Sequence, residues 1–230
     1  MFLFQKVLRK FCFLIAIALL AFIFQGCDST EPTGSTLSLR FSKPNSQQKI
    51  TNSTITLDTV KILIRDVKLK YQTDHNDDEE VSVKVGPFVV CLNLDGTVTP
   101  FVVSSIPWGT YNNVKFKIHQ LEADEIPPDP EFKEGEDSSL RYSVIVKGIY
   151  NSQPFVYKSR KSAHQKINLD TPIVVEPNTT TNLTILVDPS AWFMKGDRVL
   201  DPNNPENRND IDNNIKDSFN RCYKDEDNGG

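Results

Sequence analysis

Apolar residues recur with a period of two between Ser35 and Asp188, and this spacing places every second side chain on one face of a β-strand. Turn-forming residues divide the stretch into about nine or ten short runs. No convincing helical spacing separates the runs, so the helical crossovers typical of parallel strands are not expected. We therefore predict an all-β fold, an antiparallel β-sandwich, rather than alternating strands and helices.

Two local features of this stretch predict how the strands are shaped and joined. The alternation over 60–64 resumes one residue out of step at Val67, and the slip at 65–66 predicts a β-bulge in a long strand. Asp95-Gly96 stands between two apolar runs, and this dipeptide is typical of a two-residue β-hairpin. We therefore expect the runs on either side of Asp95-Gly96 to pair with each other.

The C-terminal segment changes its pattern after residue 190. Trp192 and Phe193 follow the last strand, and we expect them to pack beneath the connection that comes next. Asn204 suits a helix cap and Pro205 the first helical position, which predicts one amphipathic helix over 205–223 on the sandwich. The apolar stripe of this helix consists of Ile211, Ile215, Phe219, Cys222 and Tyr223.

The first 26 residues have the composition of an export signal. Three cations precede an unbroken apolar run over 11–24. These 14 residues span about 21 Å as a helix, less than the roughly 30 Å of a bilayer core, and fit the central region of a signal peptide. Gly26-Cys27 resembles a bacterial lipobox, in which the cysteine is acylated and becomes the mature N-terminus. Ordinary signal cleavage, with Cys27 as a bystander, is the alternative.

We predict four parts in the chain. They are a lipoprotein signal peptide at 1–26, a polar tether at 27–35, a β-sandwich at 36–190 and a helix with a tail that packs on the sandwich at 191–230. Removal of the signal peptide takes away three cations and no acids, so the net charge moves from −4 to −7. This acidity excludes a protein that binds nucleic acid through charge.

Two cysteines remain in the mature chain outside the lipobox. Cys222 lies on the apolar stripe of the predicted helix, and Cys91 alternates out of phase with the apolar residues around it. A helix that covers the outer face of the strand would bring both together, and an exported protein meets oxidising conditions. A disulfide between Cys91 and Cys222 is one expectation, and two free thiols are the other.

One acidic loop has the spacing of calcium ligands. Asp74, Asn76 and Asp78 match the first three ligand positions of an EF-hand. Glu79 replaces the required glycine and Val85 the final glutamate, so the loop is not an EF-hand. We predict a solvated acidic turn, with weak Ca²⁺ binding as the alternative and no metal site otherwise.

Known catalytic motifs are absent from the sequence. It contains no nucleophile elbow, no His-Glu-x-x-His zinc motif and no phosphate-binding glycine loop. An active site assembled from distant residues would leave no such motif, and His119 is a candidate for one, although a half-exposed structural histidine is the plainer interpretation. We therefore expect no enzymatic activity.

Three runs carry a resemblance to a known group of proteins. They are 62–69, 89–96 and 106–116, and the last contains Gly109-x-Tyr111 ahead of a strand. They resemble uncharacterised bacterial lipoprotein domains with a Greek-key, transthyretin-like sandwich, in which such a glycine permits a tight corner and the tyrosine packs behind it. The resemblance implies fold and export, and it supplies no catalytic residues.

Together these patterns predict a membrane-anchored lipoprotein of the bacterial cell envelope, at the outer membrane or cell surface, with the leaflet left open. We expect a non-catalytic binding or structural module that contacts the lipid bilayer through Cys27 and an envelope protein or glycan through its loops. The acidic loops at 74–80 and 124–137 are the expected contact surfaces, because loops on rigid sandwiches carry recognition. The alternative is an envelope hydrolase with a loop-borne active site.

Overall fold

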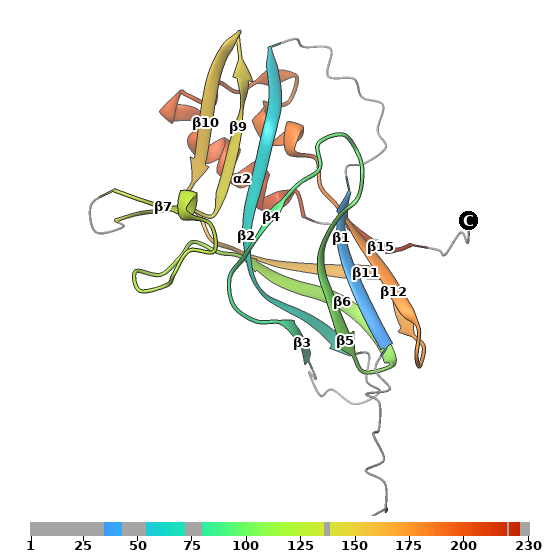
Figure 1. Cartoon of the computed structure of the whole chain (residues 1–230). Helices are drawn as coiled ribbons and strands as arrows, with labels where there is room; N and C mark the ends of the chain where they lie inside the picture. The colour runs from blue at the N-terminus through green and yellow to red at the C-terminus, as the bar shows by residue number, and fades with distance from the viewer. Residues whose placement is uncertain (1–34, 43–53, 72–79, 136–138, 220, 226–230) are drawn as a thin grey trace, which may run out of the picture. The chain divides into compact units, whose positions relative to one another are not determined.

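The structure is a computed structural model, and it describes residues 35–42, 54–71, 80–135, 139–219 and 221–225 (Figure 1). The chain divides into two compact units, Met1–Thr33 and Gly34–Gly230, and the fold described below belongs to the second. The predicted signal peptide and Cys27 lie outside the described residues.

Two large β-sheets form this unit. The first has the strand order β15-β12-β1-β5. Its strands are β1 (Ser35–Ser42), β5 (Thr99–Ile106), β12 (Thr180–Leu186) and β15 (Arg221–Lys224). β1 runs antiparallel to β5 and parallel to β12, so the prediction of an antiparallel sandwich is wrong for this one pair. Both neighbours of β1 come from much later in the chain, and only the tertiary fold determines their directions.

The second sheet is built on one long strand. Its order is β10-β9-β2-β6-β11, with β3 and β4 also paired to β2. The strands are β2 (Ile55–Tyr71), β3 (Glu80–Lys84), β4 (Phe88–Cys91), β6 (Gly109–Ile118), β9 (Val144–Tyr150), β10 (Gln153–Ser159) and β11 (Ala163–Val175). Asp66 has a φ of 55°, and the pairing of β2 with β6 shifts register between Arg65 and Lys68. The predicted bulge in a long strand is therefore confirmed.

The apolar faces of the two sheets meet in one core. Phe41 of β1 packs edge-on against Phe116 of β6, with 6.3 Å between ring centroids, and both side chains are buried. The residues that alternate on β1 and β2 supply much of this core, as the period of two predicts. The all-β sandwich class is confirmed.

The Asp95-Gly96 turn does not form a hairpin. β4, before it, pairs with β2, while β5, after it, pairs with β1 in the other sheet. The turn itself is present, because the Asp95 carboxylate accepts hydrogen bonds from the Thr97 backbone N–H and hydroxyl. These local bonds reverse the chain but leave the partners of the two strands open, and the chain crosses here from one sheet to the other.

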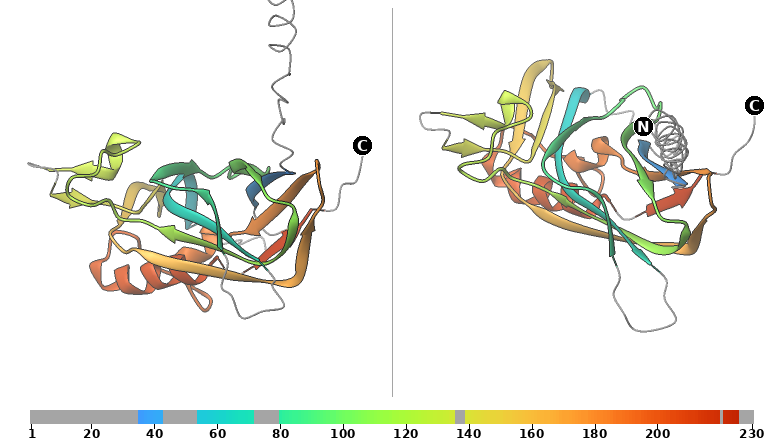
Figure 2. Two further views of the ribbon diagram at one scale, coloured as in Figure 1. Left: turned by 90° about the horizontal axis from the view of Figure 1, so that it is seen from below. Right: turned by 60° about the horizontal axis from the view of Figure 1, so that its bottom comes forward.

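The C-terminal segment contains less helix and more strand than predicted. Short 3₁₀ turns at Pro189–Phe193 (η3) and Pro205–Asn207 (η4) precede α2, Arg208–Asp217, and the chain then enters β15. Asp212 on α2 accepts a hydrogen bond of 2.7 Å from the Tyr157 hydroxyl of β10, which holds the helix beside that strand (Figure 2). The helix predicted over 205–223 is wrong beyond Asp217, because β12 offers an unpaired edge that residues 221–224 complete.

Trp192 and Phe193 are fully buried, which confirms their predicted role as packing residues of this connection. Phe193 contacts the rings of Phe155 and Tyr157. These residues belong to the core, and β15, in the segment predicted as a helix and tail packing on the sandwich, adds a strand to one of its sheets.

Of the two expectations for Cys91 and Cys222, the structure has two free thiols and not the disulfide. Cys91 and Cys222 are both free thiols, since Cys91 is exposed on β4 while Cys222 lies on β15 in the other sheet. The prediction placed Cys222 on a helix over the outer face, and β15 instead directs it toward the core. Burial, with a smaller contribution from Asp225, raises the pKa of Cys222 to about 12.

Candidate functional site

The acidic segment after β6 is folded onto the outer face of the seven-stranded sheet, and we call residues 119–135 the outer loop. Phe132, in the short 3₁₀ turn η1 (Pro130–Phe132), is fully buried there. It belongs to a second, smaller apolar cluster made with Leu63, Leu121, Tyr142 and Ile145. Strands β7 (Lys133–Glu134) and β8 (Leu140–Arg141) close the end of the loop as a two-stranded ribbon.

Cations of the sheet neutralise the acids of the outer loop. The Lys61 ammonium lies 2.6 Å from the Asp129 carboxylate and 3.0 Å from Glu131, and Lys147 lies 2.6 Å from Glu131. Hydrogen bonding to Lys61 holds the pKa of Asp129 below its ordinary value, and bonding to Lys147 and Lys61 does the same for Glu131. These pairings and the burial of Phe132 attach the described part of this loop to the sheet, while Ile126 remains 86% exposed, so the expectation that 124–137 is a contact surface stays a prediction.

His119 lies at the start of the outer loop and is fully buried, not half-exposed as expected. Its Nε2 is 2.6 Å from a carboxylate oxygen of Glu125, and Glu125 also pairs with Arg65. Burial alone would raise the pKa of Glu125, but the Glu122 N–H, His119 and Arg65 outweigh burial and lower it. While Glu125 occupies Nε2, a substrate has no access to that atom.

A pocket of about 360 Å³ opens between the two sheets where β1 ends and β2 begins. Apolar and polar side chains both form its wall, and those that the structure describes come from strands of both sheets and from the segments that join them. The pocket lies at the low end of the size range for small-molecule sites, which are typically apolar with a few polar groups. The apolar residues of the wall include Phe41, Ile55, Leu57, Leu92, Leu94 and Val187.

Polar residues contribute to the lining of this pocket, and Asp188 is the only charged one among the lining residues that the structure describes. The Asp188 carboxylate caps η3 by accepting hydrogen bonds from the Ser190 backbone N–H, at 3.1 Å, and from the Ser190 hydroxyl. A carboxylate accepts more bonds than these two, so it retains capacity for a donor from a ligand. The other polar lining residues are Ser42, Thr56, Asn93 and Thr99.

The sequence did not indicate this pocket. Its residues come from five separated segments, and their apolar positions match ordinary strand alternation. The one usable signal is Asp188-Pro189, which is typical of a helix start. That signal predicts a cap, and only the packing of the two sheets brings the cap beside an apolar opening.

The predicted calcium ligands Asp74, Asn76 and Asp78 lie outside the described residues, so this expectation stays a prediction. Among the residues that the structure describes, no group of three or more His, Cys, Asp or Glu side chains is placed to hold a metal ion. Within the same residues, no helix has the length and apolar character needed to cross a membrane.

No protein-family model, curated protein or solved structure matches this chain.

Proposed function

We propose that the chain is a lipid-anchored protein of the cell envelope whose sandwich is a non-catalytic binding module. The pocket between the sheets carries the proposal, because its lining combines apolar side chains with one carboxylate. The signal-like segment at 1–26 and the lipobox-like Gly26-Cys27 support the anchor and the cell envelope as the location.

The lining of the pocket defines the class of ligand. An apolar body of modest size fits the volume and the wall, and its burial is favourable at about 25 cal/mol per Å². Asp188 accepts hydrogen bonds, and no Lys, Arg or His belongs to the described lining. A carboxylate or phosphate group would meet repulsion there, so we expect a ligand with an amine or hydroxyl donor beside its apolar part.

Removing the thiol at residue 27 tests the anchor. Several buried acyl chains, at about 0.8 kcal/mol per methylene, retain a protein in a membrane durably. We expect the expressed wild type to gain the mass of the lipid, to lose residues 1–26 and to partition into detergent, whereas Cys27→Ala stays in the aqueous phase. A Cys27→Ala protein that still enters the detergent phase would contradict the anchor.

A neutral apolar dye with an anilino N–H, N-phenyl-1-naphthylamine, tests the pocket. We expect its fluorescence to rise on binding and Thr56→Tyr to abolish the rise, because the ring occupies the opening. Thr180→Tyr is the matched control. Thr180 is an exposed threonine of β12 that pairs with Thr36, at the end of β1 away from the pocket, so this change is expected to leave binding unchanged.

The same assay examines Asp188. An alkylamine is expected to displace the dye better than the alcohol of equal chain length, because the ammonium pairs with the carboxylate. Asp188→Asn retains a helix-capping side chain and should remove this preference without unfolding the protein. Equal dye binding by wild type and Thr56→Tyr would show that the pocket is not the site.

A further inference from the structure

We propose that the end of the sandwich that carries Trp108 contacts the membrane surface, with the indole in the headgroup region of a zwitterionic bilayer. This inference rests on the proposed acylation of Cys27. It adds a second contact, made by the folded domain itself, and it defines which end of the sandwich faces the lipid.

Trp108 is held outward by a rigid turn between β5 and β6. Its side chain is 64% exposed, whereas Trp192, the other tryptophan of the chain, is fully buried. The Tyr111 hydroxyl donates a hydrogen bond of 2.8 Å to the Pro107 carbonyl, which ties down the residue before Trp108. Gly109 follows with a φ of 151°, and an added Cβ there would lie 2.8 Å from the Tyr71 ring. The backbone on both sides of Trp108 is therefore fixed.

An indole combines a large apolar ring with one N–H donor, and tryptophan is enriched at the boundary between lipid and water for this reason. With 64% of its side chain exposed, Trp108 leaves most of its ring available for a contact outside the domain. Trp108 thus has the exposure, the chemistry and the pre-ordered geometry of an interfacial contact.

The chain enters the sandwich from the anchor at the end that carries Trp108. Ser35, at the start of β1, pairs with Ile106 of β5, so strand geometry puts the Trp108 backbone within about 12 Å of Ser35. Cys27 precedes Ser35 by eight residues, so the two Cα atoms lie at most about 29 Å apart whatever path the chain takes. An acylated Cys27 is therefore joined to the sandwich at the end that carries Trp108, which lets that end reach the bilayer first.

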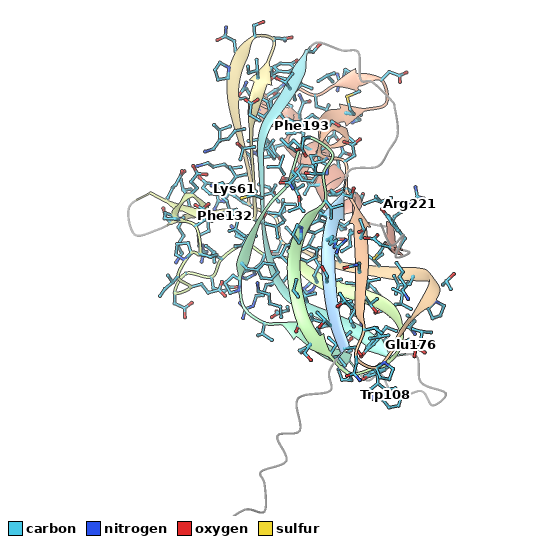
Figure 3. All side chains as sticks on the ribbon, turned by 45° about the vertical axis from the view of Figure 1, so that its right-hand side comes forward. Lys61, Trp108, Phe132, Glu176, Phe193 and Arg221 are labelled. Atoms are coloured by element: carbon cyan, nitrogen blue, oxygen red, sulfur yellow. The ribbon has the colours of Figure 1, made fainter. Side chains whose placement is uncertain are left out.

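The turn between β11 and β12 belongs to the same end. The Ser35 hydroxyl donates to the Glu176 carbonyl, and the Thr36 N–H donates to the Thr179 carbonyl at 2.9 Å. Figure 3 shows Trp108 and Glu176 together at one extremity of the sheets, as the pairing of Val175 with Gly109 requires. The carboxylate of Glu176 disfavours an anionic surface, so we commit to zwitterionic headgroups.

The pocket lies at the other end of the same strand. Ser35 begins β1, while Phe41 and Ser42 at its end line the pocket, about 24 Å away along the strand. With Trp108 at the lipid surface, the pocket lies at the end of β1 that is farther from the membrane.

Quenching of tryptophan fluorescence by brominated phosphatidylcholine tests the contact. The full chain, processed and acylated in a bacterial host, is reconstituted into vesicles with and without bromine on the acyl chains, and its membrane binding is measured by flotation. Because Trp108 is one of two tryptophans and the exposed one, we expect bromine to remove up to about half of the emission. Trp108→Phe retains the buried Trp192 as an internal control and is expected to show no quenching.

Each outcome separates the contact from the anchor. Flotation with quenching that disappears in Trp108→Phe supports both. Flotation without quenching overturns the Trp108 contact, leaves the anchor in place and points to a protein partner for this end. Wild type that does not float with the vesicles overturns the anchor, and the inference falls with it.

Discussion

Phe132→Ala is expected to lower the free energy of unfolding by about 3–5 kcal/mol, the range for removing a fully buried phenylalanine ring. Phe132 is 0% exposed and packs in the small cluster that joins the outer loop to the sheet. Its loss leaves a cavity between Leu63 and Ile145, and the ion pairs of the loop then lose the packing that holds their partners in place. Urea denaturation followed by circular dichroism measures the change.

Ile126→Ala is the matched control for this prediction. Ile126 belongs to the same outer loop but is 86% exposed, so its removal is expected to change stability by less than about 0.5 kcal/mol. Equal stability of Phe132→Ala and Ile126→Ala would show that the outer loop is not anchored by its apolar cluster.

Acid should weaken the attachment of the outer loop to the sheet. Because Lys61 and Lys147 hold the pKa values of Asp129 and Glu131 below their ordinary values, the folded state binds fewer protons than the unfolded state near pH 4. The stabilisation is complete above the unfolded pKa values, about 4 for these groups, and is lost as the pH falls below them. In the same urea experiments, stability that does not decline below about pH 4 would contradict these pairings.

Gly148→Ala is expected to destabilise the protein by about 3 kcal/mol or more, at the upper end of the effects of overpacking. Gly148 of β9 faces Leu57 of β2. A Cβ at this position would overlap the Thr56 carbonyl oxygen and lie 3.0 Å from the Phe155 ring. Because the overlap is with backbone, a change of side-chain rotamer cannot relieve it, and the two strands must separate.

Gly148→Ala should also change the shape of the pocket between the sheets. Thr56 and Leu57 line the pocket, so moving the start of β2 is expected to weaken binding of N-phenyl-1-naphthylamine at temperatures where the variant is still folded. Ile149→Ala, at the next residue and 42% exposed, is the control and should retain both stability and dye binding. Wild-type stability in Gly148→Ala would indicate that β9 and β2 are farther apart than the structure has them.

The sequence alone predicts the strands well, because side-chain alternation is a local consequence of extended backbone. The bulge in β2 follows from the same reasoning, since a slip of one residue at Arg65-Asp66 is visible in the apolar pattern. The burial of Trp192 and Phe193 was predicted for an equally simple reason, because two large aromatic side chains in succession require a core.

The predictions that the structure contradicts share one cause, which is strand pairing between residues distant in sequence. Local bonds make a turn at Asp95-Gly96, but whether the next strand returns to its neighbour or crosses to another sheet depends on residues far along the chain. Residues 221–224 show helical spacing of apolar side chains, yet the open edge of β12 makes them a strand. The disulfide expected between Cys91 and Cys222 fails for the same reason.

The sequence also does not show how the acidic side chains of the outer loop are paired. The outer loop has a strongly acidic composition, which is typical of solvated surface, but its partners Lys61 and Lys147 lie on strands whose alternation shows only that they face outward. Folding brings these opposite charges together and buries Phe132 beneath them. The described part of the loop is consequently held against the sheet, which its composition alone did not indicate.

The sequence by itself determined the all-β class, the long bulged strand and the aromatic packing after the last strand, because each depends on neighbours along the chain. The tertiary structure decided which strands pair, where the acidic loop lies and that Asp188 stands beside an apolar opening between the sheets. These features depend on contacts between residues distant in sequence, whose free energies are realised only when both sheets close on the common core.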